Sequence, residues 1–119
     1  MSEVNELIIS ALEGFGDPVQ HGTLFPDDEN RSPKMYYTFN YTTHPTYFAD
    51  NAPGYEKYLI QVHFFCPYKY NSSERTKKTK RALFGVGMTW PTVTNISEGK
   101  IQHIVFECEY IERIADGDN

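Results

Sequence analysis

The segment YEKYLIQVHFFC (residues 55–66) decides the fold of this chain. Every second residue is large and apolar: Tyr58, Ile60, Val62, Phe64 and Cys66. The reverse side carries Lys57, Gln61 and His63. Successive side chains of a strand point to opposite faces of its sheet. The segment therefore predicts a long strand with one face in a core and a more polar face on the other side.

The preceding segment alternates in the same way. Residues 34–42 place Met35, Tyr37, Phe39 and Tyr41 on one face. Between the two strands lies THPTYFADNAPG (residues 43–54), which is too long for a tight turn, so we predict a loop projecting from the sheet. Its residues Tyr47, Phe48 and Asp50 suit a docking contact, although the two rings could equally fold back on the sheet.

The rest of the chain supplies two helices and three further strands. Helical spacing predicts a helix over residues 3–15, capped by Ser2. The other predicted strands are residues 19–25, 92–97 and 101–114, the last two forming a hairpin about Glu98-Gly99. A second helix begins after Ser72 or Ser73 and stops at Gly85 and Gly87.

These elements predict an α+β fold in the order α-β-β-β-α-β-β. We expect a mostly antiparallel sheet of four to five strands with two main helices on one face. At 119 residues the chain fits a single domain, covering residues 1–114. Residues 115–119 form a tail that we expect to be frayed.

A basic run lies in the second helix. Five of the eleven Lys and Arg residues fall within seven positions: Arg75, Lys77, Lys78, Lys80 and Arg81. Phe84 lies outside the apolar stripe of this helix, among the cations. We take these six residues as a candidate subunit or partner interface, because aromatic and Arg residues are favoured at interfaces. A plain solvated face and a nucleic-acid contact are the two alternatives.

Charge and hydropathy narrow the function classes. The net charge is −5, and without the basic run six positive charges stand against sixteen negative ones, so a general nucleic-acid binder is disfavoured. No apolar stretch has the length of a membrane span, and the start lacks the features of a leader peptide. We expect a cytosolic protein. Cys66 and Cys108 fit as buried small apolar residues.

No catalytic motif is present. Both cysteines share the parity of the core face, whereas His63 and His103 have the opposite parity, which disfavours a Cys–His pair. A metal site of His63, His103 and Glu107 requires their strands to be neighbours, and such side chains are more often simply solvated. We expect neither an enzyme nor a cofactor, with a metal-dependent enzyme as the remote alternative.

Six segments together resemble the small tail-terminator or head-tail joining (tail completion) proteins of long-tailed phages and prophages of Gram-positive bacteria. They are YYTFNYTT (36–43), FADN (48–51), YLIQVHFF (58–65), KRALF (80–84), TWP (89–91) and HIVFECE (103–109). The resemblance is one of overall pattern and covers most of residues 3–113.

The resemblance implies an α+β fold and a ring of six copies that closes the tail tube and joins it to the head connector. Such proteins are virion components assembled in the cytoplasm of the bacterial host, and they are not enzymes. A closed ring needs two different, complementary surfaces on each copy. The cationic helix and the acidic remainder of the chain are candidates for that pair. The alternative is a connector or adaptor whose basic helix contacts genomic DNA.

Overall fold

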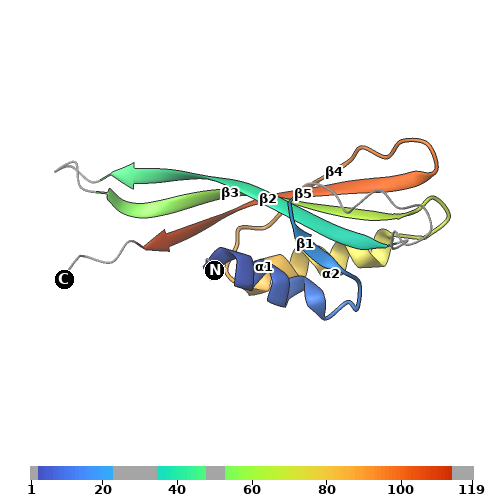
Figure 1. Cartoon of the computed structure of the whole chain (residues 1–119), viewed down its shortest axis with the longest axis horizontal. Helices are drawn as coiled ribbons and strands as arrows, with labels where there is room; N and C mark the ends of the chain where they lie inside the picture. Colours follow the sequence, from blue (N-terminus) through green and yellow to red (C-terminus); the bar gives the residue numbers. More distant parts are fainter. Residues whose placement is uncertain (1–2, 23–34, 48–52, 114–119) are drawn as a thin grey trace.

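A computed structural model describes residues 3–22, 35–47 and 53–113, in which two helices cover one face of a five-stranded sheet (Figure 1). The elements in chain order are α1 (Glu3–Glu13), β1 (Val19–His21), β2 (Tyr36–Tyr47), β3 (Pro53–Pro67), α2 (Ser73–Gly85), β4 (Thr92–Asn95) and β5 (Ile101–Arg113). This confirms the predicted α+β class and element order. Neither helix, within these described residues, is long and apolar enough to cross a bilayer.

The sheet has the strand order β1-β2-β3-β5-β4. Strand β1 is parallel to β2, and every other pair is antiparallel. Strand β3 is central: it pairs with β2 on one side and with β5 on the other, in both cases along most of its length. The outer strands are much shorter. Strand β1 pairs only with residues 37–39 of β2, and β4 pairs only with residues 104–107 of β5.

The core lies between the sheet and the helices. Helix α1 contributes Val4, Ile8 and Leu12, and α2 contributes Leu83 and Thr79. The sheet contributes alternating residues, those of β2 and β3 as predicted from the sequence: Tyr37, Phe39, Tyr58, Ile60, Val62, Phe64, Cys66, Ile104, Phe106 and Cys108. The Tyr37 hydroxyl and Thr79 Oγ1 are hydrogen-bonded at 2.8 Å, so the two buried hydroxyls satisfy each other. Both cysteines are buried and free, as expected.

Strands β2, β3 and β5 extend past the helices as a three-stranded arm (Figure 1). We use this name for residues 40–47, 53–60 and 108–113, of which Tyr58, Ile60 and Cys108 still belong to the core. Most of the predicted loop 43–54 is therefore strand, and the hairpin itself projects. The reason is composition: β-forming residues such as Thr42, Thr43 and Thr46 continue the pairing. Pro45 is tolerated because no strand of the described residues pairs with this stretch of β2 on the side away from β3.

Other boundaries differ by a few residues. Helix α1 ends at Glu13 and closes with a turn in which Phe15 N donates to Leu12 O. Strand β1 ends at His21 and is followed by a bend at Gly22, and residues 23–25 of its predicted range lie outside the described residues, as do Ser2, Phe48, Asp50 and the predicted tail 115–119. The predicted turn at Glu98-Gly99 is present, with Gly99 at a φ of 67° that favours glycine.

Two tyrosines connect the arm to acidic side chains. The Tyr110 hydroxyl donates to Glu3 of α1 at 2.8 Å, and the Tyr58 hydroxyl donates to Glu112 at 2.9 Å. Burial, followed by the Glu112 hydrogen bond, raises the pKa of Tyr58 to about 12. The Glu3 hydrogen bond, followed by burial, raises the pKa of Tyr110 to about 12. Both phenols are therefore more acidic in the unfolded chain, where the usual pKa is about 10.

Because the folded chain holds these two protons more tightly, their contribution to stability is complete below about pH 10 and is lost as the pH rises towards 12. Alkaline unfolding, followed by circular dichroism, should show this loss in the wild type. The decline should be shallower in the Tyr58→Phe/Tyr110→Phe variant. Tyr68→Phe, in a side chain that is 70% exposed, is the control and should retain the wild-type pH dependence. Equal curves for all three proteins would contradict the assignment.

Candidate interaction surfaces

Helix α2 is held at its start by the polar groups of a neighbouring strand. Gln102 of β5 donates from Nε2 to the carbonyl oxygens of Pro67, Tyr68 and Tyr70, and its Oε1 accepts from Ser72 Oγ. Ser72 occupies the predicted cap position without capping the helix, because its hydroxyl is used in this contact. Asn71 Oδ1 accepts from Ser73 N instead. The direction of α2 is thus fixed from the sheet.

The basic run of α2 is divided between two sides of the helix. Lys77, Lys78 and Arg81 are exposed, and Lys80 is half-buried. We call these four residues the cationic face. Within the part of the chain that the structure describes, none of them forms an ion pair. The positive charge is therefore available to a partner.

Arg75 is not part of the cationic face. Its guanidinium turns inward and pairs with Asp17 at 2.8 Å, and the exposed fractions of the two side chains are only 13% and 23%. The guanidinium also lies 4.9 Å from the ring centroid of Phe15 and 5.0 Å from that of Phe64. Arg75 thereby joins α2 to the turn after α1 and to β3. Its inclusion in the predicted interface is corrected on this ground.

Phe84 is exposed, as its place outside the apolar stripe predicted. It forms an edge-to-face pair with Trp90, with ring centroids 5.5 Å apart, and the two side chains are 55% and 51% exposed. Lys80 Nζ lies 5.7 Å from the Trp90 ring centroid. We call Phe84 and Trp90 the aromatic pair. Two large rings left in solvent beside unpaired cations have the composition of a protein contact.

Trp90 is positioned by a backbone connection to β5. Thr89 N donates to Glu109 O, and Glu109 N donates to Thr89 Oγ1, both at 2.9 Å. Pro91 is buried immediately afterwards. The segment after α2 is therefore fixed, and the ring is held outward. Sequence reasoning did not single out Trp90 as a site residue, although a tryptophan just after a helix-ending glycine was a usable signal.

Acidic side chains gather on α1 and on the arm. Helix α1 has Glu3 and Glu6 in its first turn and no basic residue in its last. The described arm carries Glu56, Glu109 and Glu112 against Lys57 and Arg113. One of these acids is paired, since Lys57 lies 3.5 Å from Glu109. The arm and α1 thus supply an acidic surface distinct from the cationic face.

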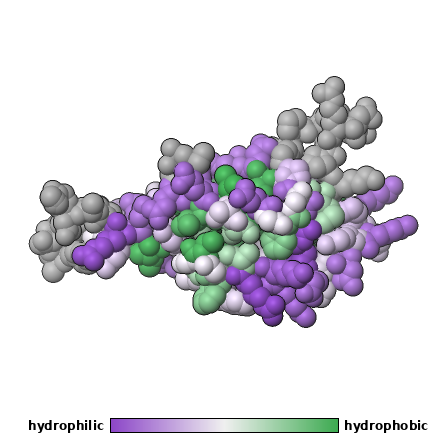
Figure 2. Space-filling view, turned by 90° about the horizontal axis from the view of Figure 1, so that it is seen from below, coloured by the Kyte–Doolittle hydropathy of each residue, from purple (hydrophilic) through white to green (hydrophobic). Residues whose placement is uncertain are grey.

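The helix layer also exposes apolar surface. Figure 2, seen from the helix side, shows hydrophobic residues near the middle of the molecule with hydrophilic residues around them. The incompletely buried apolar side chains of the helices include Leu7, Ile9 and Ala11 of α1 together with the exposed Phe84. Of the predicted loop residues, Phe48 and Asp50 lie outside the description, and for Tyr47 only the backbone is described.

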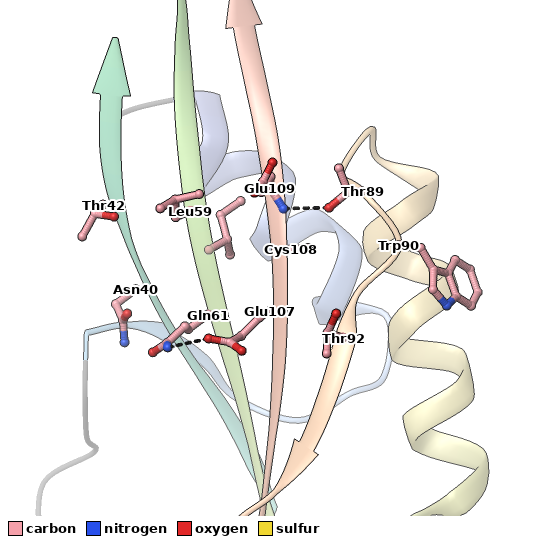
Figure 3. A pocket seen from close by; sticks show the side chains of 11 residues that line it. Asn40, Thr42, Leu59, Gln61, Thr89, Trp90, Thr92, Glu107, Cys108 and Glu109 are labelled. Atoms are coloured by element: carbon pink, nitrogen blue, oxygen red, sulfur yellow. Dashed lines mark hydrogen bonds between the residues drawn. The ribbon is translucent and has the colours of Figure 1, made fainter. Parts of the chain in front are cut away.

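The opposite face of the sheet carries a hollow of about 580 Å³ (Figure 3). Its lining is mainly polar: Asn40, Thr42, Leu59, Ile60, Gln61, Thr89, Trp90, Thr92, Glu107, Cys108 and Glu109. Gln61 Nε2 donates to Glu107 at 3.0 Å, and the Trp90 ring points away from the hollow. Burial raises the pKa of Cys108 to about 12, so this residue is a protonated thiol and a poor nucleophile at neutral pH.

The three-ligand metal site considered from the sequence does not form. His63 and His103 do meet, with His63 Nδ1 2.7 Å from His103 Nε2, but Glu107 is engaged by Gln61. Over residues 3–22, 35–47 and 53–113, no group of three His, Cys, Asp or Glu side chains is arranged to hold a metal ion. The condition that the two strands be neighbours is met, since β3 pairs with β5, but Glu107 does not join the two histidines.

Comparison with known proteins supports the fold. No family model and no curated protein matches this chain. One solved structure, whose name states no function, aligns with 99% of this chain and 99% of its own chain, with a TM-score of 0.60 and 12% sequence identity. At that level of identity the likeness concerns the fold alone.

The position of Arg75 gives a stability prediction. Arg75→Gln removes the ion pair with Asp17 and both ring contacts, so the free energy of unfolding should fall by about 2–3 kcal/mol. Lys77→Gln, a matched substitution on the cationic face of the same helix, should change it by less than about 0.5 kcal/mol. Urea unfolding measures both. An Arg75→Gln variant as stable as Lys77→Gln would show that the guanidinium contacts contribute nothing.

Proposed function

We propose that this protein is a phage or prophage structural protein that acts in tail completion or head-tail joining by forming an oligomeric ring. The observation that carries the proposal is the aromatic pair, left in solvent beside the cationic face on a body that is otherwise acidic. Burying such an aromatic surface against a partner is energetically favourable, and the neighbouring cations can pair with acidic groups of that partner.

A second copy of the chain is a suitable partner. The acidic surface of α1 and the arm complements the cationic face, and the two surfaces belong to different elements. A contact between unlike surfaces leaves one of each free on every added copy, so it propagates and closes into a ring when the rotation allows. The resemblance to tail-completion proteins supports six copies, a role between tail tube and head connector, and a site of action in the host cytoplasm and then the virion.

Opposite charges set orientation and association rate, whereas the buried rings supply most of the affinity. The two contributions can therefore be removed separately. The charge contribution weakens with salt because the cationic face is exposed, and the aromatic contribution does not.

Truncating the aromatic pair should abolish self-association without unfolding the subunit. Phe84→Ala and Trp90→Ala should each lower the free energy of unfolding by less than about 1 kcal/mol, because both rings are half in solvent. Leu83→Ala, one residue away and fully buried, should cost about 2–5 kcal/mol. Light scattering after size-exclusion chromatography gives the oligomeric state. The proposed role of Phe84 in the subunit contact is contradicted if Phe84→Ala destabilises the monomer as strongly as Leu83→Ala does and leaves assembly intact.

Charge reversal on the cationic face should also prevent assembly. Lys77→Glu/Lys78→Glu/Arg81→Glu should remain monomeric at low salt, where the wild type associates, because the proposed partner surface is acidic. Lys69→Glu/Lys100→Glu makes a similar change away from α2 and should assemble normally. A wild type that stays monomeric at every concentration would contradict ring formation by this chain alone.

The same variants test the connector alternative. DNA bound through the cationic face should dissociate steeply as salt rises, and binding should disappear in the triple variant. Salt-sensitive DNA binding by a monomeric wild type would favour a DNA-contacting adaptor over a ring held by protein contacts.

A further inference from the structure

Two histidines meet on the sheet face that the helices leave uncovered. His63 of β3 is paired in register with Val105 of β5, and His103 lies two residues before Val105 on the same face. The distance from His63 Nδ1 to His103 Nε2 is 2.7 Å, and the ring centroids are 5.0 Å apart. At that distance one nitrogen carries a hydrogen and the other offers its lone pair. The two ring nitrogens therefore point at each other.

Neighbouring aromatic rings hold the pair in position. Phe65 stacks on His103 with centroids 4.2 Å apart, and Tyr36 stacks on Phe65 at 4.8 Å. The backbone of His103 is also fixed, since its N donates to Ser97 Oγ and its O accepts from Ile96 N. Two imidazoles that are already held on adjacent strands lose little conformational freedom when they bind a ligand.

We propose that His63 Nδ1 and His103 Nε2 together bind a divalent transition-metal ion of the Zn²⁺ class, with water completing the coordination. Zinc–nitrogen bonds of about 2.0–2.1 Å at a tetrahedral angle place two nitrogens about 3.3 Å apart. The present contact of 2.7 Å has to lengthen to that separation, and both rings have to turn so that their inner lone pairs converge on the ion. The hydrogen between the rings moves to the outer nitrogen of the same imidazole, so that both inner nitrogens present lone pairs.

The surroundings suit a hydrated cation. Thr38 lies opposite His63 in register on β2, on the same face, and is fully buried. Its hydroxyl has no hydrogen-bond partner among the residues that the structure describes. Glu107 is not a ligand, because Gln61 engages it, but its charge offsets that of the ion. The ion links β3 to β5 and leaves the cationic face untouched.

Calorimetric titration of the full chain with ZnCl2 at neutral pH tests the site. The wild type should bind one Zn²⁺ per chain, and Zn²⁺ should raise its melting temperature reversibly with a chelator. His63→Ala and His103→Gln should each weaken binding by at least about tenfold, because one of two protein ligands is lost. His44→Ala, on the exposed part of β2, is the control and should bind as the wild type does.

Loss of fold cannot imitate this result, because circular dichroism reports the folding of each variant and His103→Gln keeps a polar side chain of similar size. Retained one-to-one binding in the folded His63→Ala/His103→Gln double variant would overturn the site, as would an affinity equally reduced in His44→Ala. Absence of saturable binding by the wild type would also overturn it. None of these outcomes bears on self-association through the aromatic pair, so the two proposals succeed or fail separately.

Discussion

The position of β3 between β2 and β5 is the constraint on which the rest of the structure depends. A strand that is paired on both sides over most of its length cannot shift register without moving every side chain to the wrong face. Its alternation therefore assigns Ile60 and Val62 to the core and His63 and Phe65 to the uncovered face. The histidine pair and the hollow exist because the helices cover only one of these faces (Figure 1).

The fold was largely predictable because alternation and helical spacing report directly on burial. The arm was not, because Pro45 and Pro53 at either side of residues 46–52 are typical of a loop. Strand propensity also does not take into account that, among the described residues, no strand pairs with this stretch of β2 on the side away from β3. The inward turn of Arg75 was missed for a related reason. Helical spacing alone assigns a charged residue such as Arg75 to the solvent side of the helix. Its ion pair with Asp17 and its contact with the Phe15 ring depend on segments that are distant in the sequence.

The candidate surfaces show the same division. Exposure of Phe84 followed from one helix alone and was predicted correctly. Its pairing with Trp90 required the course of the chain after α2, which the contacts between Thr89 and Glu109 determine. For the histidines, parity correctly placed both on one face, but only the register of β3 with β5 shows that they touch and that Glu107 is engaged elsewhere.

Pro45 has a consequence for how such an arm stays in solution. An uncovered strand edge normally offers a row of amide hydrogens to any extended peptide, and long free edges invite uncontrolled sheet growth. Proline has no amide hydrogen, so the hydrogen-bonding pattern along β2 is interrupted near the middle of the projecting stretch. A partner must then bind the arm through its side chains, which are specific to this sequence. Binding through backbone hydrogen bonds, which any extended peptide could form, is disfavoured.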